Sequence, residues 1–313
     1  MATHHGPPTV VVVGSTNIDL VAYLSRVPRS GETLVGRRFQ MGFGGKGANQ
    51  AVMARLLGAE VVMVNCLGDD TYGDMTLDNF AGFGIDTANV YRVPGASGVA
   101  PIWVEPDGSN RIIIIPGANH ELTGDQAARS VRRTPDAGAV VGQFEIPQEV
   151  TAAAFAAARE QGATTVLNPA PAAALSSGLL ELTDWLIPNE VEFETLSGGS
   201  PDSDRALVAF AEETATRLVV TLGEDGAAVV SAGFDRVERL PSPGVDPVDT
   251  TGAGDAFVGA FVFGLASGLG ERAAVRLGNA CAADSVTRPG TQSSFPRSER
   301  IEQLLAEIRG SSV

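Results

Sequence analysis

The stretch TVVVVG at residues 9–14 is the first indication of the fold class of this chain. A run of β-branched residues without polar alternation is typical of a strand buried on both faces of a parallel sheet. Further short apolar runs share this character, and helical stretches lie between them. The order strand, helix, strand predicts an α/β fold: a doubly wound, mostly parallel central sheet with helices on both faces. The other runs are EVVMVNCLG (60–68), AVVGQFE (139–145), TTVLNPAP (164–171), DWLIPNE (184–190) and RLVVTLG (217–223).

Two segments break this order, and we expect them to form a small β-sheet lid over the main sheet. Residues 18–41 and 98–116 have the pattern of hairpin strands, and the second segment contains the polar turn EPDGSN. The α/β core would then consist of residues 1–17, 42–97 and 117–313.

Composition narrows the choice of partners. The chain of 313 residues has a formal net charge of -15 and a pI near 4.6, which argues against nucleic-acid and anionic-membrane partners because they require a basic surface. Cys66 and Cys281 lie far apart in apolar stretches, so we expect reduced thiols. No apolar run reaches about 18 residues, and the opening MATHHGPP lacks the layout of a signal peptide. We therefore expect a cytoplasmic protein with small-molecule partners.

Polar residues follow the ends of the predicted strands. The carboxyl ends of parallel strands meet at one edge of an α/β sheet, and ligands bind there. A single polar residue at a strand end would mean little, whereas a series at successive ends predicts one shared cleft. The series consists of Asn17, Asp19, Glu145, Asn168, Asn189, Thr221 and Gly223.

The stretch MGFGGKGANQ at residues 41–50 contains the pattern G-x-G-x-x-G. A dinucleotide fingerprint should follow the first core strand directly, whereas that strand is followed by STNID. A Walker A loop is excluded because glycine, not Ser or Thr, follows Lys46. One remaining interpretation is a glycine-rich hinge between lid and helix. The other is a sugar site, because glycines let a ligand approach the backbone while Lys46 and Asn49 donate to hydroxyls.

A second glycine-rich stretch, VDTTGAGDAFVGAF at residues 248–261, opens a long apolar helix. Its small residues leave backbone N–H groups uncovered at the helix N-terminus, where the macrodipole favours negative charge, and this predicts an anion hole. Asp255, in the first turn, has two interpretations. It is either a helix-capping residue or a general base that takes a proton from an attacking hydroxyl during phosphoryl transfer.

Eight motifs, in order, resemble those of the ribokinase-like carbohydrate kinase family. The similarity spans about residues 9–305, and the ordered series is far more specific than either glycine pattern alone. The motifs are GSTNIDL, GFGGKGANQA, GQFEIP, NPAPA, IPNEVE, TLGEDG, DTTGAGDAF and VTRPGTQSS.

The resemblance implies a role for each matching residue. Asn189 and Glu192 would organise magnesium and phosphate, Glu192 indirectly, whereas the residues alone favour an ordinary helix N-terminus. The catalytic set would be the base Asp255 with the anion-hole residues Gly254, Ala253 and Gly252. Sugar hydroxyls would be bound by Asn17, Asp19, Gly44, Gly45, Lys46, Asn49, Glu145 and Asp255. ATP would be bound by Asn189, Thr221, Gly223, Glu224, Gly226, Gly254 and Asn279.

The resemblance also implies a potassium site beside the anion hole. Oxygen ligands of low total charge suit a large, weakly hydrated cation, which would fix the loop so that its N–H groups point at the phosphoryl group. The alternative is that Asp249 caps a turn and Arg288 neutralises it. The implied potassium ligands are Asp249, Thr251, Ser285, Arg288, Gly290 and Ser294.

Together these features predict an ATP-dependent kinase that phosphorylates D-ribose at O5 to give D-ribose 5-phosphate and ADP, with Mg²⁺ and K⁺ as cofactors. The alternatives are a family kinase for deoxyribose, a nucleoside or a hexose, and a sugar-binding regulatory protein without catalysis. Intact Asp255, Gly254 and Glu192 count against the last. The apolar lid segments LVAYL and IIII and their strand edges predict a homodimer joined through the lids, as the resemblance also implies.

Overall fold

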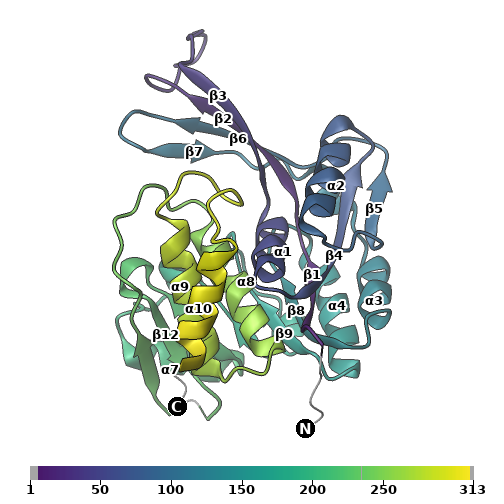
Figure 1. Cartoon of the computed structure of the whole chain (residues 1–313), viewed down its shortest axis with the longest axis vertical. Helices are drawn as coiled ribbons and strands as arrows, with labels where there is room; N and C mark the ends of the chain where they lie inside the picture. Colours follow the sequence, from purple (N-terminus) through teal and green to yellow (C-terminus); the bar gives the residue numbers. More distant parts are fainter. Residues whose placement is uncertain (1–5, 234, 311–313) are drawn as a thin grey trace.

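The structure is a computed structural model that describes residues 6–233 and 235–310. A large α/β core carries a smaller sheet at one end (Figure 1), and the predicted fold class is confirmed. The first five residues of the predicted core lie outside the described part of the chain. No helix among the described residues is long and apolar enough to cross a bilayer. The expected cytoplasmic location stays a prediction.

The central sheet has nine strands within the described residues, in the order β13-β12-β11-β10-β9-β8-β1-β4-β5. Pairing is parallel from β5 to β11, whereas β12 and β13 add an antiparallel hairpin at one edge. Every predicted core strand is present, and β5, β12 and β13 are additional. The strands are β1 (Thr9–Val13), β4 (Glu60–Gly68), β5 (Val90–Val93), β8 (Ala137–Gly142), β9 (Thr164–Leu167), β10 (Trp185–Leu186), β11 (Arg217–Thr221), β12 (Ala227–Val230) and β13 (Val237–Leu240).

Helices cover both faces of this sheet, which explains the unbroken apolar run of β1. Val10 and Val12 pack into one hydrophobic cluster with α1, α2, α8, α9 and α10, while Val11 and Val13 pack into another with α3 to α7. The helices are α1 (Lys46–Leu56), α2 (Thr71–Phe83), α3 (Gly124–Arg132), α4 (Gln148–Glu160), α5 (Ser177–Leu180), α6 (Glu190–Ser197), α7 (Asp204–Thr214), α8 (Ala253–Ala266), α9 (Glu271–Ser285) and α10 (Glu299–Gly310), with the short 3₁₀ turns η1 (Gly117–Glu121) and η2 (Gly223–Asp225).

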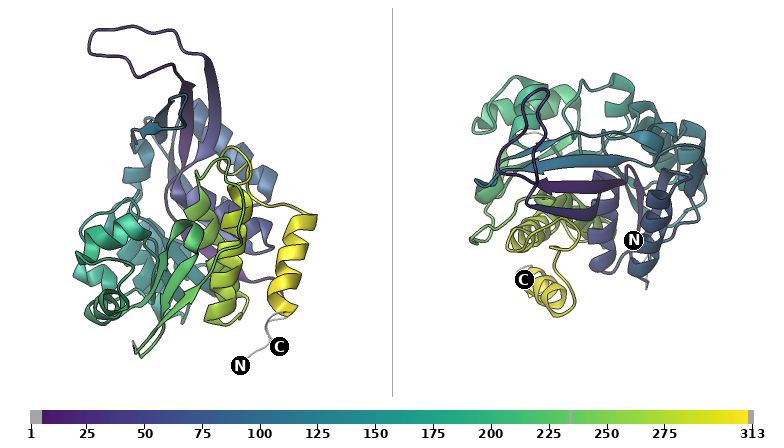
Figure 2. Two further views of the ribbon diagram at one scale, coloured as in Figure 1. Left: turned by 90° about the vertical axis from the view of Figure 1, so that its left-hand side faces the viewer. Right: turned by 90° about the horizontal axis from the view of Figure 1, so that it is seen from above.

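The smaller sheet is built from the two segments predicted to form the lid. Its strand order is β3-β2-β6-β7, and it is mixed because β2 pairs antiparallel with β3 but parallel with β6. The side and top views show it standing over the end of the core to which β1 leads (Figure 2). Whether lid and core behave as separate domains stays a prediction. The lid strands are β2 (Asn17–Tyr23), β3 (Arg38–Gly44), β6 (Val99–Val104) and β7 (Asn110–Ile112).

Candidate active site

A cavity of about 170 Å³ lies at the carboxyl ends of β9, β10 and β11. Residues at the ends of these three neighbouring strands meet there with the start of α1 and the first turn of α8. The predicted shared cleft is thus present in part: of the predicted series, Asn168, Asn189 and Thr221 line the cavity, whereas Asn17, Asp19, Glu145 and Gly223 do not. The lining residues are Lys46, Asn168, Ala170, Ile187, Asn189, Glu192, Thr221, Gly252, Gly254, Asp255 and Val258.

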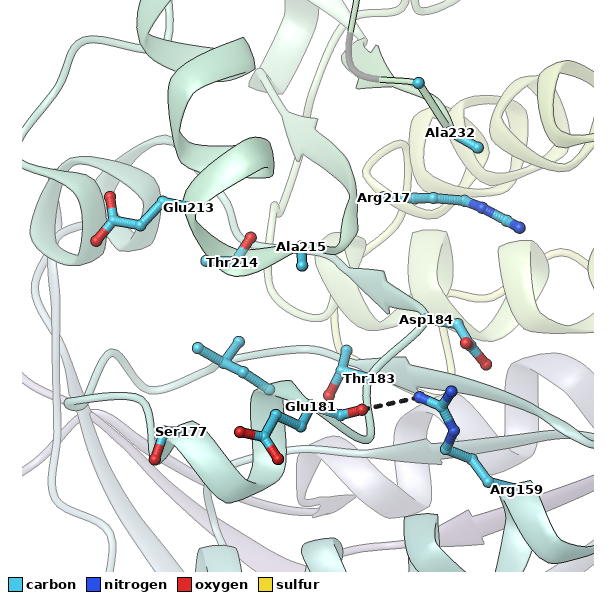
Figure 3. A pocket seen from close by; sticks show the side chains of 12 residues that line it. Arg159, Ser177, Glu181, Thr183, Asp184, Glu213, Thr214, Ala215, Arg217 and Ala232 are labelled. Atoms are coloured by element: carbon cyan, nitrogen blue, oxygen red, sulfur yellow. Dashed lines mark hydrogen bonds between the residues drawn. The ribbon is translucent and has the colours of Figure 1, made fainter.

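A larger pocket of about 660 Å³ lies at the opposite edge of the core (Figure 3). Asp184 and Arg217 line it at the amino ends of β10 and β11. Arg159, also in its wall, donates a hydrogen bond to the carbonyl of Glu181 at 2.8 Å. Ligands of open α/β sheets bind at the carboxyl ends of the strands, so the smaller cavity is the candidate active site.

Three glycines of the first glycine-rich stretch, Gly44, Gly45 and Gly47, make room for the protein's own atoms. A Cβ on Gly44 would lie 2.4 Å from both carboxylate oxygens of Asp19. Gly45 has a φ of +87°, and a Cβ there would lie 2.6 Å from the Cα of Thr16. These contacts pack the start of α1 against the connection from β1 to β2 and place the Asp19 carboxylate against Gly44.

Lys46 is the first residue of α1 and the only lysine of the chain. Burial lowers the pKa of its ammonium group, but the charges of the Asp255, Glu145 and Glu192 carboxylates raise this pKa by more than burial lowers it. The net shift of the pKa is therefore upward. Glu145 Oε2 accepts hydrogen bonds from Ser15 Oγ and from the backbone N–H of Lys46, the latter at 3.0 Å. A charged ammonium group thus stands among several carboxylates.

Asp19 and Asn17 lie on β2, where the lid leaves the core. Asn17 Oδ1 accepts a hydrogen bond from Asn119 Nδ2 at 3.0 Å, which fixes the start of the strand. Burial and the charges of Glu145 and Asp255 raise the pKa of Asp19 to about 7, and no described residue donates a hydrogen bond to its carboxylate. Both oxygens are therefore open acceptors, as sugar hydroxyls require.

Asp255 lies in the first turn of α8 and is buried. Asn49 Nδ2 donates to its Oδ2 at 2.8 Å, and Gln50 Nε2 donates to its Oδ1 at 3.1 Å. Burial raises the pKa of Asp255, and this outweighs the opposing effects of Lys46 and the two amides. Gly252, not Asp255, is the N-cap of α8, so the capping interpretation is wrong. Asn49, which was expected to contact sugar, contacts the proposed base.

The N-terminus of α8 opens onto the cavity. Gly252 has a φ of +79°, and a Cβ there would lie 2.5 Å from Thr291 Cγ2. The N–H of Ala253 donates to the carbonyl of Thr250 at 3.2 Å, whereas a Cβ on Gly254 would meet nothing within 4 Å. A ligand can therefore approach the backbone at Gly254, where the helix dipole favours an anion.

Asn189 and Glu192 form a capping box at the start of α6. Glu192 N–H donates to Asn189 Oδ1 at 2.8 Å, and Asn189 N–H donates to Glu192 Oε2 at 2.9 Å. The ordinary helix N-terminus is thus present, but both residues also line the cavity together with Thr221. One local motif therefore serves the helix and faces the site.

The other predicted ATP-binding residues lie near the end of β13. Gly223 and Glu224 belong to η2, and Gly226 follows it with a φ of +94°. A Cβ on Gly226 would lie 2.2 Å from the carbonyl oxygen of Leu240. Asn279 Nδ2 donates to the same carbonyl at 2.8 Å. These residues hold a turn together, and their contact with a nucleotide stays a prediction.

The loop that carries Asp249 is tied to the loop after α9. Asp249 Oδ1 accepts a hydrogen bond from Thr251 N–H at 3.0 Å, and its Oδ2 accepts one from Gly290 N–H at 2.9 Å. Arg288 instead pairs with an aspartate on α9 and donates to the carbonyl of Ser294. Asp249 does hold a turn, but the idea that Arg288 neutralises it is wrong. Within the described chain no cationic side chain lies within ion-pair distance of Asp249.

The sequence pattern of pfkB family carbohydrate kinases matches residues 8–298, nearly the whole chain. The chain belongs to the pfkB family of carbohydrate kinases. It is 38% identical over 303 residues to a deoxyribokinase of Salmonella typhi, with 95% of this chain and 98% of the relative covered. It is also 38% identical over 302 residues to a ribokinase of Haemophilus influenzae, with the same shares covered, 95% and 98%.

A solved relative agrees with this assignment. The structure of Arabidopsis thaliana ribokinase complexed with ribose and ATP has a TM-score of 0.87 at 31% identity, covering 96% of this chain and 99% of that one. The predicted enzyme class is confirmed: this pfkB kinase transfers phosphate to a sugar hydroxyl.

Several amide side chains of this kinase's site did not stand out in the sequence. Gln50 directly follows Asn49, and Gln143 precedes Glu145 within the GQFEIP motif, so their places in the motifs could have marked them. Gln292 also lies within a motif, VTRPGTQSS, although its partner Asn49 is distant in the chain. Asn119 lies on η1, outside the eight motifs, and no local pattern marks it, because only the fold brings it to Asn17.

Proposed function

We propose that this kinase phosphorylates D-ribose at O5, with ATP as donor and D-ribose 5-phosphate and ADP as products. The observation that carries the proposal is the position of Asp255, which is buried beside Lys46 at the open N-terminus of α8. Asp19 and Glu145 offer acceptors for further hydroxyls of a small polyol, and their charges reach Asp255. Ribose and ATP are the molecules bound by the similar Arabidopsis thaliana ribokinase.

In the proposed reaction Asp255 takes the proton of the sugar hydroxyl. The hydroxyl oxygen attacks the γ-phosphorus of ATP, the bond to the β–γ bridging oxygen breaks, and that oxygen leaves with ADP. Burial raises the pKa of Asp255, which makes its carboxylate a stronger base than one in water. Gly254 N–H and the ammonium group of Lys46 stabilise charge on the transferred phosphoryl group. Lid closure would exclude water.

Magnesium would be held near Glu192. Glu192 Oε2 accepts a hydrogen bond from the N–H of Asn189, and burial raises the pKa of the Glu192 carboxyl group. A nearby cation would oppose this effect of burial and favour the ionised carboxylate. Carboxylates and substrate phosphates are the usual ligands of Mg²⁺, which keeps several waters. When bound, the ion would neutralise charge on the phosphates.

A potassium ion would be held by the two loops that Asp249 joins. The Asp249 carboxylate has no cationic partner in the described chain, and Ser285 ends α9 just before the second loop. Gly290 and Ser294 lie in that loop. Carboxylate and carbonyl oxygens suit a weakly hydrated cation, which would fix the N-terminus of α8 without touching the substrate.

2-Deoxyribose is the second candidate sugar, because the chain is as similar to a deoxyribokinase as to a ribokinase. The test is ADP release with ATP and Mg²⁺ over a panel of ribose, 2-deoxyribose, hexoses and nucleosides, with Asp255→Asn as the inactive control. We expect the highest kcat/KM with ribose, and phosphorus NMR should place the phosphate on O5. A higher kcat/KM with 2-deoxyribose than with ribose would identify 2-deoxyribose as the preferred substrate. No sugar-dependent ADP release would reject the kinase proposal.

We further propose a homodimer joined through the lids. Phe39 and Ile112 are 65% and 49% exposed, and β3 and β7 form the edges of the lid sheet. Exposed apolar side chains beside unpaired strand edges favour association with a second copy. Light scattering at micromolar concentration should give the mass of a dimer, and a monomer mass would refute the proposal.

A further inference from the structure

A chain of two glutamines ends on one oxygen of the Asp255 carboxylate. Gln143 Nε2 donates to Gln50 Oε1 at 2.6 Å, and Gln50 Nε2 donates to Asp255 Oδ1 at 3.1 Å. Both glutamines are fully buried, at 0% exposure. Because the amide oxygen of Gln50 is taken by Gln143, its amino group faces the carboxylate, where it also reaches Asn168 Oδ1 at 3.1 Å.

A second chain of amides ends on the other oxygen. Asn79 Nδ2 donates to Gln292 Oε1 at 3.0 Å, Gln292 Nε2 donates to Asn49 Oδ1 at 3.1 Å, and Asn49 Nδ2 donates to Asp255 Oδ2 at 2.8 Å. Gln292 and Asn49 each accept a hydrogen bond from the outer residue and donate one to the inner residue, so the chain runs in one direction from Asn79 to Asp255. It links α2, the loop after α9, α1 and α8.

We propose that Gln50 and Gln292 are positioning residues for Asp255. Through the two chains they hold its carboxylate in one orientation and stabilise its ionised form. Neither glutamine lines the cavity, so both would act on the reaction only through Asp255. The inference rests on the proposed role of Asp255 as the base.

Charged groups from several elements also face Asp255. They are Lys46 at the start of α1, Glu145 after β8, Glu192 on α6 and Asp19 on β2. Three of these are acidic and, like burial, disfavour the ionised form of Asp255, whereas an amide N–H donor favours it. Loss of one amide donor therefore raises the pKa of Asp255 and moves the acid limb of the kcat profile to higher pH.

The test compares Gln50→Met with Gln143→Met. Both changes remove an amide of similar length from a fully buried position, but only the first removes a donor to Asp255. For Gln50→Met we expect kcat to fall about tenfold or more and the acid limb to rise by about one pH unit, with the KM of the sugar within about threefold. Gln143→Met should shift the limb much less. Gln292→Met tests the other chain if Gln50→Met does not fold.

A second readout needs no turnover. Carbon-13 NMR of the aspartate carboxylates gives the pKa of Asp255 directly, with Asp255→Asn identifying its signal. A higher pKa in Gln50→Met or Gln292→Met than in the wild type supports the inference, whichever sugar is the substrate. An unchanged pKa and an unchanged acid limb in the folded variants would overturn it. Failure of the wild-type enzyme to release ADP with any sugar would count against the proposed function alone.

Discussion

Asp255 and Asp19 belong to the same site but are held in opposite ways. Asp255 stands on a core helix, and Asn49 and Gln50 each donate a hydrogen bond to one of its oxygens. Asp19 stands on a lid strand, and its carboxylate accepts no hydrogen bond from the described residues. A group that must act in one geometry benefits from a fixed orientation, whereas a group that binds hydroxyls needs free acceptors. The core thus fixes the carboxylate that takes part in the reaction, whereas the lid carries a carboxylate whose oxygens are free to accept hydrogen bonds from the ligand.

The largest expected effect comes from the core side of this comparison. Asp255→Asn keeps the shape of the side chain but removes the base, so turnover should fall about a hundredfold or more while sugar binding weakens less. Steady-state kinetics with an ADP-release assay measures this. Asp19→Asn is the matched control and should raise KM more than it lowers kcat. A folded Asp255→Asn enzyme with more than about a tenth of wild-type turnover, chemistry being rate-limiting, would show that Asp255 is not the base.

A glycine substitution tests the lid side. In Gly44→Ala the new Cβ would lie 2.4 Å from both oxygens of Asp19 and must displace the carboxylate. We expect the KM of the sugar to rise about ten- to hundredfold with kcat little changed, since a lost charged hydrogen-bond partner costs about that much. Gly42→Ala is the control, because the nearest atom to its Cβ would be Asp19 Cβ at 4.0 Å. Equal losses in the two variants would contradict the assignment.

The pH dependence should separate the two aspartates further. The pKa of Asp19 is about 7, and its ionised form is the stronger acceptor for sugar hydroxyls, so kcat/KM should rise by up to about tenfold between about pH 6 and pH 8. Stability has the opposite sign: a raised carboxyl pKa means that the folded state binds the proton more tightly, so the free energy of unfolding falls as pH rises from about 4 to about 7. Asp19→Asn should flatten both trends, and what remains of them belongs to Asp255 and Glu192, whose carboxyl pKa values are also raised. A variant with unchanged trends would exclude Asp19 as a source.

The smallest effect concerns the loops behind Asp255. Replacing potassium by sodium or lithium at constant ionic strength should lower turnover roughly three- to tenfold, because the loop at the N-terminus of α8 would be held less well. Asp249→Ala should be slow and insensitive to the exchange. Identical wild-type rates in all three salts, with potassium rigorously excluded from the others, would reject the cation site.

The core sheet could be predicted because a strand buried on both faces must be apolar throughout. The edge strand β13 (VERL) lacks that signal because polar side chains at a sheet edge can face solvent, whereas its neighbour β12 (AAVV) is apolar and buried but only four residues long. The lid was predictable from the turn EPDGSN, which joins β6 to β7. Sequence patterns thus reveal buried strands that are long enough to show an apolar run, and they miss strands that are very short or partly exposed to solvent.

The site was predictable in its reacting groups but not in its supports. The motifs marked Asp255 and Lys46. They also contain Asn49 and Gln292, but not the contact between these two, which spans a large separation in the chain. The sequence also suggested that the glycines make room for a ligand, yet Gly44 makes room for Asp19. Such contacts depend on tertiary distances, which no local pattern contains.

The single lysine makes the site chemically distinct from the rest of the molecule. All other basic side chains of the Lys and Arg type are arginines. Lys46 is therefore the one side chain that can react with a reagent for primary amines. Acylation requires the neutral amine, and both burial and a raised pKa protect this one. Its rate of modification, read as one mass increment on a peptide that contains Lys46, would therefore report how often the site opens, and a bound sugar should slow it.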